Sequence, residues 1–132
     1  KLAIDIFNDD CIQFQSKEKE MHAFLDKTQL IRILTNLVKN ALQATEEIEN
    51  PEIIVNVSSE NEFLKITVSD NGKGIANELK ELIFEPKFTT KTSGMGLGLA
   101  MIKNIIEAYD GHISFISEIN KGTIFTVILP KN

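Results

Sequence analysis

The sequence contains a single cysteine, Cys11, so no disulfide can form within the chain. A fold that does without disulfides suits a reducing compartment, and we expect a cytoplasmic location. No apolar run approaches the roughly 20 residues that a membrane-spanning helix needs, and the chain shows no signal peptide. Because it begins at Lys1 rather than at a methionine, we expect one domain of a longer protein, which could be anchored in a membrane elsewhere.

Positive charge is also scarce. Lysine and arginine number 14 against 19 aspartate and glutamate residues, which gives a formal net charge of −5. Surfaces that bind nucleic acid through general electrostatic attraction carry the opposite balance, so we expect no nucleic-acid partner. A site for one small anion needs only a few local donors, so this class of ligand stays open. The 132 residues, 42% of them hydrophobic, suit a single domain covering 1–132 with its own core.

Hydrophobic periodicity divides the chain into strands and helices. The expected elements are strands at 2–7 and, more weakly, 20–25, a long helix at 28–47, strands at 53–58 and 63–69, a short helix at 78–84, a loop at 85–93, a second long helix at 96–109, and strands at 112–117 and 123–129. The two later pairs of strands are separated by short turns, so they form hairpins and favour a mostly antiparallel sheet. Both long helices can bury their apolar sides on one face of that sheet. The predicted fold class is therefore α+β, a two-layer sandwich.

Two asparagines, Asn36 and Asn40, lie four residues apart in "NLVKNALQA" and so share one face of the first long helix. Their neighbours are apolar, so the two amides need hydrogen-bond partners on a semi-buried surface. An amide oxygen is an acceptable ligand for Mg²⁺ where phosphate oxygens and water supply the other ligands. Taken alone, the pair is more simply explained by hydrogen bonds to the backbone or to a loop.

The stretch "SDNGKGI", residues 69–75, places Asp70 at the end of a strand, followed by Gly72 and Gly74. A carboxylate beside glycines, which let a planar ligand approach, can accept a hydrogen bond from an exocyclic amine. The alternative is a plain turn, since aspartate, asparagine and glycine in succession are a strong turn signal.

Three glycines, Gly94, Gly96 and Gly98, alternate with apolar residues where the second long helix begins. A glycine inside a helix costs about 1 kcal/mol relative to alanine, so this start has a reason other than helix stability. The free N–H groups and partial positive charge of a helix N-terminus suit a phosphate. Neither the P-loop nor the dinucleotide-binding spacing is present. A flexible helix entry is the alternative.

The preceding loop, "FEPKFTTKTSG", supplies donors next to these glycines. Lys87 and Lys91, with Thr89 and Thr90, could reach an anion bound at the helix start. Lysines in loops are commonly only solvated, and that explanation carries equal weight here.

In this order, "NLVKNALQA", "DNGKGI", "FEPKFTTK" and "GMGLGLA" resemble the catalytic ATP-binding domain of sensor histidine kinases. These kinases belong to the GHKL superfamily, with DNA gyrase, the MutL mismatch-repair proteins and heat-shock chaperone ATPases. The resemblance covers residues 2–130 and looks closest to the nitrogen-regulation type, which has a short lid over ATP. It implies the Bergerat fold, in which helices cover one face of a mostly antiparallel mixed sheet.

The resemblance implies an adenine pocket around the second motif. Asp70 matches the aspartate that holds the adenine amine, and Gly72 and Gly74 match the glycines that shape the pocket. Ile75 is expected to pack on the ring. Thr123, in "GTIF", matches a threonine that reaches adenine through water.

The other motifs are implied to hold Mg²⁺ and the phosphates. Asn40 matches the magnesium-binding asparagine and Asn36 the first asparagine of the same motif, which we also expect to contact the nucleotide. Many relatives have a lysine where this chain has Gln43, so positive charge on the phosphates must come from Lys87, Lys91 or Lys39. Asn40 and Lys91 are the catalytic candidates. The expected phosphate contacts are Gly94, Gly96, Leu97 and Gly98 at the helix start and Lys87, Thr90 and Lys91 in the lid.

Two further features favour a kinase over an ATPase. The ATPase branches carry a glutamate base where this chain has Asn36, so rapid hydrolysis of ATP is not expected. Of the two histidines, His22 lacks the helical context of the family's phosphoacceptor, and His112 follows a glycine at a strand start. Both are more simply structural, so the phosphoacceptor helices are expected to be absent from this chain.

The function implied is that of a protein histidine kinase domain in two-component signal transduction. The chain would bind Mg²⁺ and ATP and donate the γ-phosphoryl group to a histidine on a separate dimerisation domain, which passes it to a response regulator. The fragment is expected to be monomeric and the full kinase a homodimer. One alternative is a GHKL serine kinase of the anti-sigma class, which predicts a glutamate near Asn36. The other is an interaction module that has lost nucleotide binding, which predicts damaged motifs.

Overall fold

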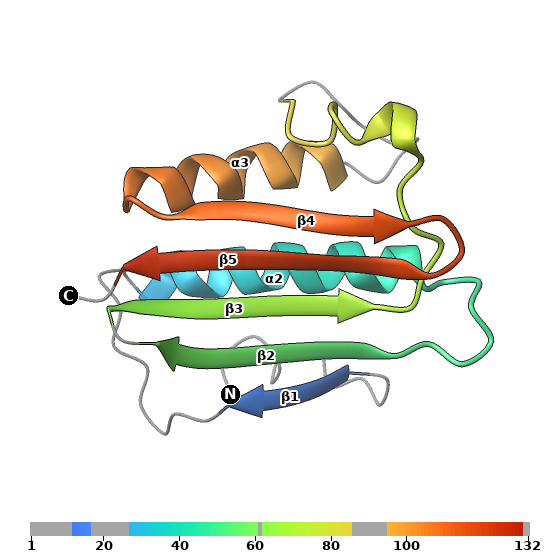
Figure 1. Cartoon of the computed structure of the whole chain (residues 1–132), viewed down its shortest axis with the longest axis horizontal. Helices are drawn as coiled ribbons and strands as arrows, with labels where there is room; N and C mark the ends of the chain where they lie inside the picture. Colours follow the sequence, from blue (N-terminus) through green and yellow to red (C-terminus); the bar gives the residue numbers. More distant parts are fainter. Residues whose placement is uncertain (1–11, 17–26, 61, 86–94, 131–132) are drawn as a thin grey trace.

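The described part of the chain forms a five-stranded sheet with two long helices (Figure 1). The computed structural model describes residues 12–16, 27–60, 62–85 and 95–130. The elements in chain order are β1 (Ile12–Ser16), α2 (Lys27–Ala44), β2 (Ile53–Glu60), β3 (Phe63–Asp70), the 3₁₀ helix η1 (Asn77–Leu79), α3 (Met95–Ala108), β4 (His112–Glu118) and β5 (Gly122–Pro130).

The strands lie in the order β1-β2-β3-β5-β4. β2 with β3, β3 with β5, and β4 with β5 are antiparallel, whereas β1 runs parallel to β2. Both predicted hairpins are present, and the second closes through a turn in which Asn120 has a φ of 65° and Gly122 a φ of 128°. The predicted fold class, a mostly antiparallel mixed sheet with helices, is confirmed.

One face of the sheet and the apolar sides of both helices share a hydrophobic core. Side chains alternate along a strand with a period of two, so every second residue points toward the helices. Figure 1 shows α2 crossing behind β5 and β3, with α3 running beside β4. The fully buried core residues include Ile33, Leu37 and Val38 of α2, Ile53, Val55 and Val57 of β2, Leu64, Ile66 and Val68 of β3, Ile102 and Ile106 of α3, and Val127 and Leu129 of β5.

The structure differs from the sequence predictions at one strand and at one helix. The strands expected at 2–7 and 20–25 lie outside the described residues, and the strand observed at Ile12–Ser16 was not expected. The helix expected at 78–84 is wrong: only Asn77–Leu79 is helical, as a 3₁₀ turn. Its N-cap, Ala76, makes no side-chain capping bond, and the turn has no buried residue. Ile83 is buried and Phe84 packs against the core, so the segment does have an apolar side. Its backbone bonds, such as Leu82 N–H to Leu79 and Glu85 N–H to Leu82, join residues three apart, as in 3₁₀ turns, and no side chain caps a longer helix.

Candidate functional site

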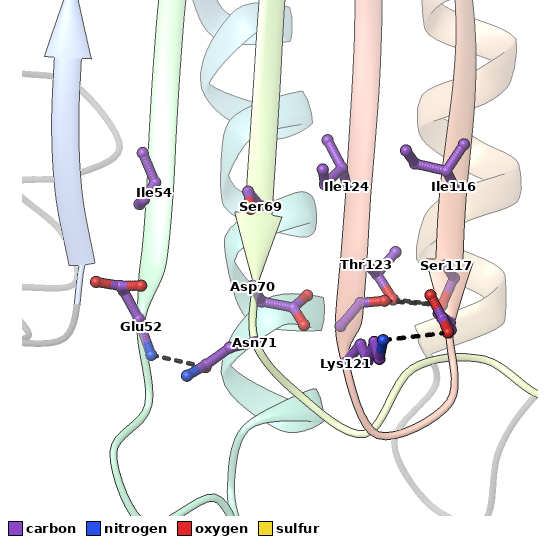
Figure 2. A pocket seen from close by; sticks show the side chains of 12 residues that line it. Glu52, Ile54, Ser69, Asp70, Asn71, Ile116, Ser117, Lys121, Thr123 and Ile124 are labelled. Carbon is purple, nitrogen blue, oxygen red and sulfur yellow. Dashed lines mark hydrogen bonds and ion pairs between the residues drawn. The ribbon is translucent and has the colours of Figure 1, made fainter.

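A buried carboxylate lies where β3 ends. Asp70 pairs in register with Thr123 of β5 and is only 9% exposed. Its Oδ1 accepts the backbone N–H of Gly72 at 2.8 Å, and the carboxylate also accepts the backbone N–H of Thr123. Burial raises the pKa of Asp70 above its usual value of 3.8, and the two backbone donors lower it by less. Figure 2 shows the side chain pointing from β3 toward Thr123.

Backbone hydrogen bonds hold the segment after Asp70 to α2 and to the β4–β5 turn. The backbone N–H of Lys73 donates to the carbonyl of Ala44 at the end of α2, at 3.1 Å, and the N–H of Asn120 in the β4–β5 turn donates to the carbonyl of Lys73 at 2.9 Å. Gly74 has a φ of 77°, and a Cβ there would overlap the carbonyl of Glu118. A glycine is therefore required at this position by the fold itself, whatever the loop binds.

Asn40 presents a buried amide on α2. The residue is 8% exposed, and its Nδ2 has no hydrogen-bond partner among the described residues. One turn further along the helix, Gln43 Oε1 is in the same condition. A buried polar group without a partner costs roughly 1–3 kcal/mol, so a ligand that supplies one would be favoured. The carbonyl of Ala44 accepts a hydrogen bond from the loop after Asp70, so Asp70 and Asn40 both lie near the C-terminal end of α2.

Asn36 has different surroundings, although it shares the helix face of Asn40 as predicted. Its Nδ2 donates to the carbonyl of Arg32 at 2.9 Å. Its Oδ1 lies against Gly98 of α3, so close that a Cβ at position 98 would overlap it. The structure thus brings Asn36 and Gly98 together at the contact between the two helices. Whether either touches a nucleotide stays a prediction.

We expect Gly98→Ala to destabilise the fold through this contact. Alanine is the better helix former by roughly 1 kcal/mol, but the new methyl group displaces the Asn36 amide, and overpacking costs about 1–3 kcal/mol. In an Asn36→Ala background the methyl group has room, so the same substitution is expected to be neutral or stabilising. Urea unfolding of the wild type, the two single variants and the double variant measures this coupling. An equal effect in both backgrounds would contradict it.

The expected phosphate contacts lie only partly within the described residues. Lys87, Thr90, Lys91 and Gly94 fall outside them. Gly96 and Leu97 belong to the first turn of α3, which carries no acidic residue. The first N–H groups of any helix have no partner within the helix, and the sequence of this first turn contains no acidic residue that would repel an anion.

The expected adenine contacts Ile75 and Thr123 meet at a residue that the sequence analysis missed. Ser117 of β4 accepts the N–H of Ile75 and contacts the hydroxyl of Thr123. Ile75 itself packs partly buried against the core. Nothing in the local sequence of β4 indicates that this serine connects Ile75 and Thr123, because the residues of this strand are exposed or half-buried. Only the pairing of β4 with β5 reveals it.

A cavity on the other face of the sheet extends to the sheet end where Asp70, Ser117 and Thr123 lie, and these three residues are part of its lining. It has a volume of about 400 Å³, and Ile54, Ser69, Ile124 and Ile116 form a row across its wall (Figure 2). These residues alternate with the core-facing ones, so they belong to the face away from the helices. Among the described residues, no group of three or more histidine, cysteine, aspartate or glutamate side chains could hold a metal ion.

Comparison with known proteins supplies independent observations. A family model described as "Histidine kinase-, DNA gyrase B-, and HSP90-like ATPase" matches residues 25–132. The chain is 45% identical over 105 residues to a probable C4-dicarboxylate sensor kinase of Halalkalibacterium halodurans, covering 77% of this chain and 20% of that protein. It is 44% identical over 107 residues to the sensor histidine kinase ZraS of Escherichia coli K12, covering 81% of this chain and 23% of that protein.

Solved structures agree. The catalytic domain of histidine kinase ThkA, free of nucleotide, matches with a TM-score of 0.83 at 34% identity, covering 98% of this chain and 88% of that chain. A mycobacterial sensor histidine kinase, MprB, shares the fold, with a TM-score of 0.77 at 21% identity. The chain therefore corresponds to nearly a whole solved domain, but to only about a fifth to a quarter of the curated relatives' length.

Proposed function

The chain belongs to the family of histidine kinase-, DNA gyrase B- and HSP90-like ATPases and matches the catalytic domain of sensor histidine kinases, and we propose that it binds Mg²⁺ with ATP and donates the γ-phosphoryl group to a histidine on a separate dimerisation domain. The observation that carries the proposal is the buried carboxylate of Asp70 near the end of the helix that presents the unpartnered amide of Asn40.

Asp70 suits the amine of adenine. A carboxylate held by two backbone donors keeps lone pairs free to accept an N–H from the ligand. Its partners fix its orientation before the nucleotide arrives, which lowers the entropy lost on binding. Because an ionised carboxylate only accepts hydrogen bonds, it favours a base with an amino group over one with a carbonyl group at that position.

The residues present fit a magnesium ion that arrives with the nucleotide. Asn40 would offer one amide oxygen to the ion and its unpartnered N–H donors to a phosphate oxygen. The described residues hold no cluster of acidic, histidine or cysteine ligands, so phosphate oxygens and water would supply the other positions. When bound, Mg²⁺ would neutralise part of the negative charge on the phosphates. Lys91 and Lys87 are proposed to neutralise more of it, and Thr90 to contact the phosphates, from the segment that is expected to cover ATP.

The surroundings of Asn36 support a kinase rather than an ATPase. The relevant side chain is an amide, which has no basicity at neutral pH, and it is bonded to the backbone of its own helix and packed on α3. No described residue at that position can remove a proton from an attacking water. ATP should therefore persist until a histidine is brought to it.

The wider context is also a proposal, since the chain spans only part of its relatives. We infer a dimerisation domain that carries the phosphoacceptor histidine, a response regulator that receives the group, a homodimeric full-length kinase, and a cytoplasmic position for this domain. No helix in the described ranges is long and apolar enough to cross a bilayer. The isolated chain is proposed to be monomeric.

The proposal is tested with γ-labelled ATP. We expect the chain alone to release almost no phosphate and to label itself negligibly. Adding a dimerisation domain from the same kinase should produce label that is stable to base and lost in acid, as phosphohistidine is. Sustained phosphate release at about 1–10³ s⁻¹, the ordinary range for enzymes, or no transfer to any histidine-bearing domain, would contradict the proposal.

A further inference from the structure

One hydroxyl group connects three parts of the proposed adenine pocket. Ser117 Oγ accepts the backbone N–H of Ile75 at 2.8 Å. It lies 2.8 Å from Thr123 Oγ1 and 3.2 Å from the carbonyl oxygen of Gly122. Figure 2 shows the contact between Ser117 and Thr123 at the same end of the sheet as Asp70. Ser117 thus touches the loop after β3 and the start of β5 at once.

Either hydroxyl could donate in the contact between Ser117 and Thr123, and counting protons favours one direction. A serine hydroxyl has one proton to donate and two lone pairs that accept. A carbonyl oxygen can only accept, so the proton of Ser117 goes to Gly122. The two lone pairs then take the N–H of Ile75 and the O–H of Thr123. This is the assignment in which all three contacts are hydrogen bonds, and it uses the full capacity of the hydroxyl.

The consequence falls on Thr123. In this assignment the Thr123 proton goes to Ser117, so Thr123 Oγ1 has only lone pairs left for another partner. Thr123 stands directly opposite Asp70 in the sheet register, and Asp70 accepts its backbone N–H. At this end of the sheet, therefore, the Asp70 carboxylate and the Thr123 hydroxyl both act as acceptors.

We propose that Ser117 is a positioning residue that sets the base selectivity of the pocket. It accepts hydrogen bonds from the Thr123 hydroxyl and the Ile75 N–H. The pocket therefore presents acceptors, which bind the amino group of a base and disfavour a carbonyl group. This inference rests on the proposed function, because it assumes that the base lies against Asp70. Ser117 acts through its neighbours and needs no contact with the nucleotide.

The backbone of Ser117 is held independently of its hydroxyl. Its carbonyl accepts the ammonium group of Lys80 at 2.8 Å, and β4 pairs with β5 on either side of it. Removing the hydroxyl should therefore leave the strand in place while releasing the proton of Thr123 and the N–H of Ile75. The effect should appear in binding more than in folding.

The test compares ADP with inosine diphosphate, which carries a carbonyl in place of the amino group. Calorimetric titrations are made with the wild-type chain, Ser117→Ala and Ser117→Thr, which keeps the hydroxyl. Ser114→Ala is the matched control, because Ser114 lies on the same strand and is exposed on the face of the sheet away from the helices. Ser117→Ala should lower ADP affinity about five- to tenfold, the effect of one lost hydrogen bond. The preference for ADP over inosine diphosphate should fall by a similar factor.

The outcomes separate the two claims. Wild-type selectivity retained in Ser117→Ala, or an equal loss for ADP, inosine diphosphate and tripolyphosphate, would overturn the role of Ser117. Restoration by Ser117→Thr, with Ser114→Ala unchanged, supports it. If Ser117→Ala does not fold by circular dichroism, Ser117→Cys, similar in size with a much weaker acceptor, is expected to show the same loss of selectivity. A wild-type chain that binds neither diphosphate would instead refute the proposed function.

Discussion

Replacing Asp70 with asparagine is expected to weaken ATP binding about 10- to 100-fold. A hydrogen bond to a charged group contributes roughly 1.5–3 kcal/mol, and the asparagine amide would direct N–H donors at the adenine amine. The variant keeps an oxygen that can accept the N–H of Gly72, so the loop after β3 should hold its shape. Calorimetry with an ATP analogue measures the loss, and unchanged affinity would rule out Asp70 as the adenine partner.

The same substitution should not destabilise the fold. Burial raises the folded-state pKa of Asp70, so ionising it costs more in the folded chain than in the unfolded one. The protonated carboxyl of Asp70 therefore contributes to the free energy of unfolding. This contribution is fully present below pH 3.8, the pKa in the unfolded chain, and is lost as the pH rises through the higher pKa of the folded chain. Asp70→Asn removes this dependence, so at neutral pH we expect equal or greater thermal stability.

A matched control is available for this experiment. Asp110 is an exposed aspartate at the end of α3 with a φ of 64°, a conformation that asparagine also tolerates. Asp110→Asn should leave the ATP affinity unchanged, and it should also leave the dependence of folding stability on pH unchanged. A large loss of stability in Asp70→Asn at neutral pH, absent in the control, would contradict the reading of Asp70 as a group held for binding.

Replacing Asn40 with alanine is expected to abolish the contribution of Mg²⁺ to nucleotide affinity. Without the amide oxygen, the ion has no protein ligand on α2, so titrations with and without Mg²⁺ should converge. Removing Nδ2 should cost the fold no hydrogen bond within the described residues, because this group has no partner there. Asn104→Ala, on the exposed side of α3, is the control. A variant that still responds to Mg²⁺ like the wild type would refute the ligand role.

Local periodicity predicted the elements whose patterns are strong. α2, α3 and the strands of both hairpins lie within three residues of their expected bounds, because each buries one regular face. β1 was missed because "IQFQS" has only two large apolar residues and because its partner is distant in sequence, with Ile12 pairing with Ile53 of β2. That pairing is parallel, so no hairpin turn signals it.

The site was predictable in composition but not in its internal contacts. Spacing placed Asn36 and Asn40 on one helix face, yet α3 crosses over Asn36 and leaves Asn40 with an unpartnered group. Which of two neighbouring amides is covered depends on how the helices pack, and one sequence does not contain that information. Ser117 was missed for the same reason, because its partners come from β5 and from a loop some 40 residues earlier.

The central claim is that this chain is a magnesium-dependent nucleotide-binding domain. Calorimetric titration of the wild-type chain with a non-hydrolysable ATP analogue, with and without Mg²⁺, tests it most directly. We predict one site per chain, with affinity that rises clearly when Mg²⁺ is present. No binding in either condition would contradict the account, and would leave a domain with this fold that works through protein contacts alone.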